Sequence, residues 1–311
     1  MNPVHLLFKR NALFHEPGPK DWGKLLTTGA SASLCQNGKH QSPIDIKTVD
    51  LVFDQTLEKM NIHGKDEPLE LTVRNLGQDL LLSLPPDQIF IDGGPLVYFY
   101  EVFEIRVKFG SQSTRGSDHQ INGRTFPGEL QIFAFNKHIY ENRTLASSSP
   151  HGLAAISVLF QLGNQTNKDL YGVVSAAAKT IFKGQSLLLK GLEIRALLSS
   201  TNEYMTYDGS LTSPGCYETV TWIILNHPIT ITETELSTLR KLRIAGTLWS
   251  GFMADNFRPV QATYNRSVRT NIKMNYMIKQ PSAIIDAPCE SAALHFKRSP
   301  KWHPVFPARS I

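Results

Sequence analysis

Apolar and polar residues alternate along the middle of the chain, most regularly between Phe103 and Phe109. In this segment the odd positions are apolar and the even positions are charged. A period of two residues is typical of a β-strand whose two faces lie in different environments. We therefore expect Glu104, Arg106 and Lys108 on one face of a strand.

Other segments have the composition or alternation of strands and are bounded by Gly, Pro, Asn or Asp. They are Leu69–Asn75, Leu80–Leu84, Glu129–Asn136, Leu153–Leu162, Ser186–Leu189 and Thr219–Leu225. Two short helices are predicted, the Ala-rich Leu170–Ile181 and Glu233–Arg243, which follows the capping-box pattern Thr232-x-x-Glu235. The pattern predicts a strand-dominated fold with a few short helices.

The domain organisation follows from where linker-like composition occurs. The middle of the 311-residue chain contains no such segment, so we expect one main domain over residues 20–278. Residues 1–19 form a predicted N-terminal extension with few spaced apolar positions. Residues 279–311 form a Pro-rich basic tail, which we do not expect to pack into the domain.

Composition excludes some classes of protein. A hydrophobic content of 41% is enough for a full core, so a wholly disordered chain is excluded. No run approaches the roughly 18 apolar residues of a membrane span, and none is predicted. The net charge of +5 comes without a dense basic block that contains aromatic residues, so nucleic acid is not an expected partner.

Five short motifs lie along the chain, and they are Gln41–Ile46, Gly116–His119, Gly209–Pro214, Thr221–Trp222 and Asp255–Gln261. Because they occur in the order and at roughly the spacing seen in the α-carbonic anhydrases, the sequence resembles that family. The resemblance implies a mainly β (α+β) single domain with a large, twisted, mostly antiparallel central sheet and short peripheral helices. It also implies an active-site funnel that reaches a zinc ion held by three histidines.

The resemblance places the three zinc-ligating histidines at positions 106, 108 and 131. Here the strand that would read His-x-His reads Arg106-Val-Lys108, and the strand that would read Glu-Leu-His reads Glu129-Leu-Gln131. Arg and Lys side chains are cationic at neutral pH and offer no lone pair to a metal. We therefore expect no zinc, no other cofactor and no carbonic anhydrase activity.

Several supporting positions of the family site can also be located through the resemblance. Asp118 stands where a glutamate orients a threonine hydroxyl, and Thr212 stands at that threonine. Gln78 occupies the position of the proton-shuttle histidine, and an amide does not shuttle protons near neutral pH. Phe133 replaces a small aliphatic residue, so a narrower substrate pocket is expected.

Acidic and histidine residues around these positions have expected roles as well. Glu104 and Glu129 each lie two residues from a substituted ligand position, on the same face of the strand. We expect Arg106 to form an ion pair with Glu104, Glu129 or Asp118. His119 has a structural counterpart in the family, so we expect it to be buried and hydrogen-bonded.

The cysteines and glycosylation sequons bear on the cellular compartment. Cys35 and Cys216 lie where secreted and membrane-attached family members have a disulfide; two buried thiols are the alternative. Cys289 is left over in the basic tail. The sequons begin at Asn142, Asn164 and Asn265. We expect a secreted, glycosylated protein, although residues 1–14 show no recognisable signal peptide.

Further motifs are most similar to the secreted, acatalytic carbonic anhydrase-related proteins ten and eleven. These motifs are Arg106, Tyr140–Thr144, Cys216–Thr219 and Arg269–Ile272. The resemblance implies a neuronal, central nervous system setting with neurexins as partners. Lys108 departs from some members of that group, and Gly215 replaces the second Pro of a Thr-x-Pro-Pro run.

We therefore expect a non-enzymatic, extracellular binding protein that uses a carbonic anhydrase scaffold to recognise a cell-surface protein. One alternative is a residual zinc lyase or esterase, which Arg106, Lys108 and Gln131 disfavour. Another is a module that binds a carboxylate or phosphate through Arg106 and Lys108. Phe133 and the neighbouring acidic residues disfavour this second alternative.

Overall fold

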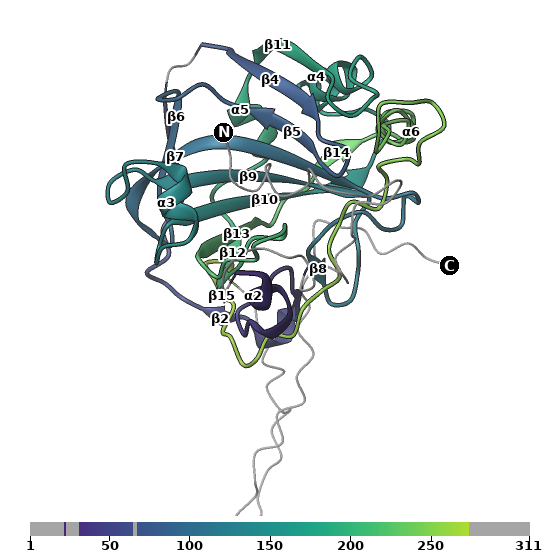
Figure 1. The fold of residues 1–311 in the computed structure, drawn as a ribbon. Helices are drawn as coiled ribbons and strands as arrows, with labels where there is room; N and C mark the ends of the chain where they lie inside the picture. Colours follow the sequence, from purple (N-terminus) through teal and green to yellow (C-terminus); the bar gives the residue numbers. More distant parts are fainter. Residues whose placement is uncertain (1–21, 23–30, 65–66, 274–311) are drawn as a thin grey trace, which may run out of the picture.

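The computed structural model describes residues 22, 31–64 and 67–273. In this part of the chain, one large mixed sheet crosses the domain and short helices lie at its periphery (Figure 1). The hydrogen-bonded order is β11 (Ser186–Leu192), β4 (Leu69–Asn75), β5 (Leu80–Ser83), β7 (Leu96–Phe109), β9 (Gly128–Asn136), β10 (Leu153–Leu162), β13 (Val220–Leu225), β12 (Tyr204–Gly209), β15 (Arg269–Thr270) and β2 (Val52–Phe53).

Smaller elements complete the architecture. Strand β6 (Ile89–Gly93) pairs with β7 and carries β3 (Met60–Gly64), while β14 (Ile229–Ile231) pairs with β10. A separate parallel pair is formed by β1 (Asp45–Ile46) and β8 (Gln120–Ile121). Residues Thr48–Asp50 form a 3-10 turn, and the helices are α2 (Ser31–Asn37), α3 (Arg143–Ser147), α4 (Lys168–Ala177), α5 (Ile194–Leu197) and α6 (Glu233–Leu239).

Most neighbouring strands of the large sheet are antiparallel, as the resemblance implies, but β10 and β13 run parallel near its centre and β15 and β2 run parallel at one edge. Strand β9 is buried at every position because both of its faces are covered. Its sequence, GELQIFAFN, therefore lacks a polar, solvent-facing side. The single mainly β domain expected from the resemblance is confirmed.

The pairing of β7 with β9 fixes which side chains meet on the central strands. Arg106 lies opposite Gln131, and Lys108 lies opposite Glu129. The register shifts between Val102 and Glu104, which makes Phe103 a β-bulge. Downstream of this bulge, Glu104, Arg106 and Lys108 share one face, as the period of two predicts.

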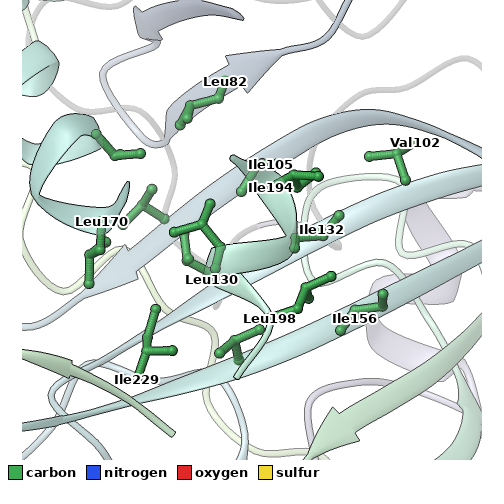
Figure 2. Packing of buried hydrophobic residues seen from close by; sticks show 14 of the residues in the cluster. Leu82, Val102, Ile105, Leu130, Ile132, Ile156, Leu170, Ile194, Leu198 and Ile229 are labelled. Atoms are coloured by element: carbon green, nitrogen blue, oxygen red, sulfur yellow. The ribbon is translucent and has the colours of Figure 1, made fainter. Parts of the chain in front are cut away.

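Two apolar clusters cover the opposite faces of the sheet. The larger one packs strand residues against α4 and α5; Figure 2 shows Ile105, Leu130 and Ile132 with Leu170 and Ile194. The smaller one includes Phe133, Phe135 and Trp222 on the other face. The charged positions of β7 lie on the side of this smaller cluster.

The strands predicted at Leu69–Asn75 and Leu153–Leu162 form with those bounds, and the other five predicted strands form with shifted ends. Both helices end earlier than predicted. After α4, the amides of Lys179 and Thr180 donate to the carbonyls of the residues three positions earlier, which tightens the chain into a 3-10 turn. After α6, the amide of Arg243 bonds to the carbonyl of Ile181 and thereby leaves the helix.

The capping box at the start of α6 also differs from the expected form. The Thr232 hydroxyl donates to the Glu235 carboxylate, while the Thr232 amide donates to the Thr166 hydroxyl. A side chain from another segment thus takes the place of the expected local partner. Helix α6 nevertheless begins at the predicted residue.

Residues 1–19 and 279–311, predicted as extension and tail, lie outside the described residues, as does Cys289. Within the described ranges, no helix combines the length and apolar character that a membrane crossing requires.

Candidate functional site

The candidate site is the charged cluster on the face of β7 and β9 that also carries Phe133 and the smaller apolar cluster. Arg106, Lys108 and Gln131 come together here because β7 and β9 are adjacent and their side chains share a pleat face. These are the positions at which the resemblance places zinc ligands. Their contacts decide what the cluster is able to do.

Lys108 is the most deeply buried cation of the cluster, with a side chain only 3% exposed. Its Nζ donates to Asp79 Oδ1 at 2.7 Å and to the backbone carbonyl of Asn256 at 3.2 Å. Asp79 lies at the turn between β4 and β5 and is itself buried. The charge of the lysine is thus matched by a carboxylate inside the protein.

Arg106 lies beside Lys108 and uses a different acid. Its Nη2 and Nε lie 2.6 and 2.8 Å from Glu104 Oε1, and its Nη1 lies 3.9 Å from Asp79 Oδ2. Burial alone would lower the pKa of Arg106, but the charges of Glu104 and Asp79 raise it. The predicted ion pair with Glu104 is confirmed, and Asp79 joins it.

Gln131 is fully buried and joins several supporting groups. Its Nε2 donates to Asp118 Oδ2 at 2.7 Å and to Glu129 Oε1 at 3.1 Å, and its Oε1 accepts from the Thr212 hydroxyl at 3.3 Å. Both amide hydrogens and the amide oxygen therefore have partners. Gln131 contacts both Asp118 and Thr212, and the Thr212 hydroxyl is also close enough to the Asp118 carboxyl to lower its pKa by hydrogen bonding.

His119 is buried beneath this cluster, as predicted. Its Nδ1 lies 2.8 Å from Glu129 Oε1, and its Nε2 lies 2.7 Å from the Tyr207 hydroxyl, which donates onward to Ser42. His119 is thus held from both ring nitrogens. This arrangement supports a structural role and leaves neither nitrogen pointing at an open position.

The protein shifts the pKa values of the two buried carboxyls, Asp118 and Glu129, in opposite directions. Burial raises the pKa of Asp118; Lys108 opposes this rise, and the neighbouring Glu129 charge adds to it. Burial would also raise the pKa of Glu129, but the charge and hydrogen bonds of His119 outweigh it and lower that pKa. Glu129 is therefore the carboxyl that the fold holds ionised.

The side chains at the three positions do not fit a zinc ion. The nitrogens of Arg106 and Lys108 are hydrogen-bond donors engaged with carboxylates, and Gln131 offers only an amide oxygen. Among the described residues, no three His, Cys, Asp or Glu side chains are grouped so as to hold a metal. The buried Ser157 hydroxyl, opposite Gln131 in the β9–β10 pairing, lacks a partner and is not a typical zinc ligand.

The alternative anion site meets a different obstacle. Arg106 and Lys108 already contact the carboxylates of Glu104 and Asp79, so an incoming carboxylate or phosphate would have to compete with fixed internal anions. The ring of Phe133 covers part of the guanidinium, with a centroid distance of 5.1 Å. The geometry does not favour anion capture.

Two further expected positions are placed as follows. Phe133 is fully buried and packs edge-on against Trp222, with ring centroids 5.7 Å apart. It therefore fills space on the face that carries Gln131. Gln78 is exposed on the turn that also carries Asp79.

Asp79 is a residue of the site that sequence reasoning missed; Asn256 belongs to the motif Asp255–Gln261, but its contact with Lys108 was not predicted. Asp79 lies 29 residues before Lys108, and Asn256 lies 148 residues after it. The only local signal was a single Asp at the start of the apolar strand β5. Only the pairing of β5 with β7, which brings Leu80 opposite Val107, places this carboxylate beside the lysine.

The disulfide expected from the resemblance is confirmed. Cys35 and Cys216 are bonded, with an S–S distance of 2.11 Å and a Cα–Cα distance of 5.0 Å. Arg258 strengthens this region by donating to the carbonyls of Cys35 and Ser42, and burial lowers the pKa of Arg258 to about 10. The disulfide therefore belongs to a hydrogen-bonded joint between α2 and the segment after β12.

All three sequon asparagines lie on the exposed surface. Asn142 is the N-cap of α3, where its Oδ1 accepts from the amide of Leu145 at 3.0 Å. In the sequon that begins at Asn164, the Thr166 hydroxyl donates to Glu235 at 2.9 Å. These placements leave all three asparagines accessible and engage the Thr166 hydroxyl internally.

Comparison with known proteins identifies the family. The model of the eukaryotic-type carbonic anhydrases matches residues 17–272. Carbonic anhydrase-like protein 2 of Caenorhabditis elegans is 36% identical over 266 residues, which are 83% of this chain and 77% of that protein. Carbonic anhydrase-like protein 1 of the same organism is 45% identical over 185 residues, which are 59% of this chain and about half (51%) of that relative. The chain therefore belongs to the eukaryotic-type carbonic anhydrase family.

Proposed function

We propose that this chain is a catalytically inactive carbonic anhydrase-related protein that serves as an extracellular protein-binding module. The observation that carries the proposal is the pairing of Lys108 with Asp79, beside that of Arg106 with Glu104. In these pairs, cationic side chains of the chain itself provide the positive charge that a metal ion would provide in an active family member. Because side chains fill the position of the active site, we assign the function of the protein to its surface.

Loss of catalysis is supported by three independent features. The positions that would ligate zinc carry a guanidinium, an ammonium and an amide, none of which generates a metal-bound hydroxide. Gln78 supplies no proton shuttle. Phe133 occupies space beside Gln131 that a small substrate would need.

An extracellular location is proposed from the disulfide and the sequons. Stable disulfides form mainly in oxidising compartments, and the Cys35–Cys216 bond closes across 181 residues. The exposed asparagines 142, 164 and 265 are placed where oligosaccharide could be attached. The partner we propose is a neuronal cell-surface protein, with neurexins as first candidates because of the resemblance to the related proteins ten and eleven.

Zinc content and CO₂ hydration test the catalytic half of the proposal. The full chain, secreted from animal cells, is dialysed against zinc and then against buffer, with an active carbonic anhydrase treated identically. We expect zinc far below one ion per chain and hydration at the buffer rate, while the control retains both. One tightly held zinc per chain with catalysed hydration would show instead that the chain is an enzyme.

Binding to an immobilised neurexin ectodomain tests the other half. A catalytically active carbonic anhydrase, secreted from the same cells, is the matched control for the scaffold. We expect saturable binding by this chain alone. If both or neither of the two proteins bind, neurexin recognition is refuted, and capture on neuronal membranes would then decide between another surface partner and none.

A further inference from the structure

The loop that follows α6 exposes an unusual concentration of large apolar side chains. Trp249 is 97% exposed, Leu248 is 68% exposed and Phe252 is 56% exposed, all within five residues. Isolated exposed apolar residues are ordinary, but a contiguous group with a fully exposed tryptophan commonly marks an interaction surface. The loop extends from the end of α6, in the yellow-green part of the chain in Figure 1.

This loop is held in shape by its own contacts. The Arg243 guanidinium lies 3.8 Å from the centroid of the Phe252 ring and donates to the carbonyl of Ser250 at 2.8 Å. The amide of Ile244 bonds to the carbonyl of Gly251 at 3.0 Å, which closes the loop at its base. Trp249 is therefore presented by an ordered loop, which lowers the entropic cost of binding.

The base of the loop packs against the start of the turn between β4 and β5, which carries Asp79. The Asn75 side chain donates to the carbonyl of Arg243, and the amide of Lys183 donates to the carbonyl of Ala245. Asn75 begins the turn that holds Asp79. The loop that carries Trp249 is thus anchored at its base to the start of the turn that leads to Asp79.

The surroundings of Trp249 are basic. Residues 178–190 and 238–254 contain three basic residues each and no Asp or Glu. Arg240 and Lys190 are paired with Glu233 and Glu70, and Lys183 is engaged within the chain as well. Arg243 is the cation that lies on the loop itself, over the Phe252 ring. The carboxylate of Asp79 faces inward to Lys108, so it does not offset the positive charge beside the loop.

We propose that Leu248, Trp249 and Phe252, together with Arg243, form a docking surface for an acidic protein segment. This set is called the Trp249 surface. The partner segment would present Asp or Glu side chains around one large apolar side chain. Trp and Arg are enriched among residues that dominate binding energy, and complementary charge speeds association. This inference rests on the proposed function and specifies its binding face.

A lipid surface is a less suitable occupant. Arg243 covers one face of the Phe252 ring, which leaves Leu248 and Trp249 as the side chains that project freely. Two apolar side chains bury little area in a membrane, and each basic residue near an anionic lipid surface adds only about 1 kcal/mol. The same two side chains suffice as the centre of a protein interface.

The test selects partners without assuming their identity. The secreted full chain is used to select from a phage-displayed library of random dodecapeptides, and the enriched peptides are synthesised for affinity measurement. We expect peptides that combine Asp or Glu with Trp, Phe or Leu. Trp249→Ala should weaken their binding by about tenfold or more. Val97→Ser, which alters another highly exposed apolar residue (86% exposed), should leave it unchanged.

Other outcomes overturn the proposal. Peptides without acidic enrichment, peptides that bind Trp249→Ala as well as wild type, or no enrichment at all would each refute the Trp249 surface. Trp249-dependent binding to phosphatidylserine vesicles, without peptide binding, would assign the loop to membranes. If the neurexin ectodomain binds Trp249→Ala and wild type equally, the surface is wrong although the proposed function stands. Zinc-dependent hydration by wild type would refute the proposed function independently.

Discussion

Lys108 Nζ lies 2.7 Å from Asp79 Oδ1, with both side chains buried. The ammonium occupies a position that the family resemblance gives to a zinc ligand. A positive charge on the chain thus faces a buried carboxylate at close range. The second cation, Arg106, contacts the same aspartate at 3.9 Å. Asp79 is therefore the group that holds the altered centre together.

Replacing Asp79 by Ala should destabilise the protein strongly. The substitution leaves the buried ammonium of Lys108 unpaired and weakens the surroundings of Arg106, and such a loss typically costs about 3–5 kcal/mol. Urea unfolding at neutral pH measures the change. Glu70→Ala, which removes an exposed partner of Lys190, is the matched control and should cost less than about 1 kcal/mol. Equal effects would show that burial does not govern these pairs.

Lys108→Ala and Arg106→Ala should both destabilise, with Lys108→Ala costing more. The Lys108 side chain is 3% exposed, whereas that of Arg106 is 18% exposed, so solvent can partly replace Arg106 at Glu104. We expect about 3–5 kcal/mol for Lys108→Ala and about 1–3 kcal/mol for Arg106→Ala. Thermal and urea unfolding of the two variants side by side determine the order. A larger loss at Arg106 would contradict it.

The contribution of Glu129 to stability should depend on pH. Because folding lowers its pKa below the ordinary 4.5, its ionised form stabilises the native state above that pH, and the benefit is lost as pH falls through the folded value. Glu129→Gln should therefore cost most near neutral pH, about 1–3 kcal/mol, and less at about pH 3.5. Urea unfolding across this range measures the difference.

The effect of Asp118→Asn on stability should depend on pH in the opposite direction to that of Glu129→Gln. Folding raises the pKa of Asp118 above its ordinary 3.8, so the stabilisation belongs to the protonated form and is lost as pH rises through the folded value. Relative to wild type, Asp118→Asn should thus become more favourable with increasing pH. Parallel pH profiles for the two variants would contradict the opposite pKa directions.

Restoring three imidazoles should restore zinc binding but little activity. Arg106→His, Lys108→His and Gln131→His together place three histidines on one pleat face, with Glu129 positioned to accept from residue 131. Each single variant should fail to hold zinc because cations remain. Zinc content after dialysis and CO₂ hydration rates measure both effects. Fast hydration by the triple variant would show that Gln78 and Phe133 do not limit catalysis.

The long strands were predictable because their own side chains carry the pattern. Strand β4 alternates buried and exposed residues, and β10 is a long apolar run, so both could be bounded from sequence. Strands β2 and β15 have two residues each, which is too few to display a period. The ends of α4 and α6 depend on contacts with other segments, which local propensity does not encode.

The site was predictable where it is local and unpredictable where it depends on register. Glu104 lies two residues from Arg106 on one strand, so the period of two brought them together in advance. Asp79 meets Lys108 only through the β5–β7 pairing. The Trp249 surface was missed as well, because a single tryptophan in a sequence does not reveal its exposure.

Beyond the bulge at Phe103, strand β7 is sensitive to changes in length. Before it, Val102 faces the larger apolar cluster from an even position; after it, Ile105 and Val107 face the same cluster from odd positions. Deletion of Phe103 itself would leave a regular ladder, because Val102 and Glu104 already pair with the consecutive residues Ala134 and Phe133. Deletion of one residue beyond the bulge, between Glu104 and Phe109, would instead turn the residues that follow it to the opposite faces of the sheet. Charges would then be directed into the larger apolar cluster, at a desolvation cost that no nearby carboxylate offsets. Beyond the bulge, strand β7 therefore tolerates exchange of its inward side chains far better than an insertion or a deletion.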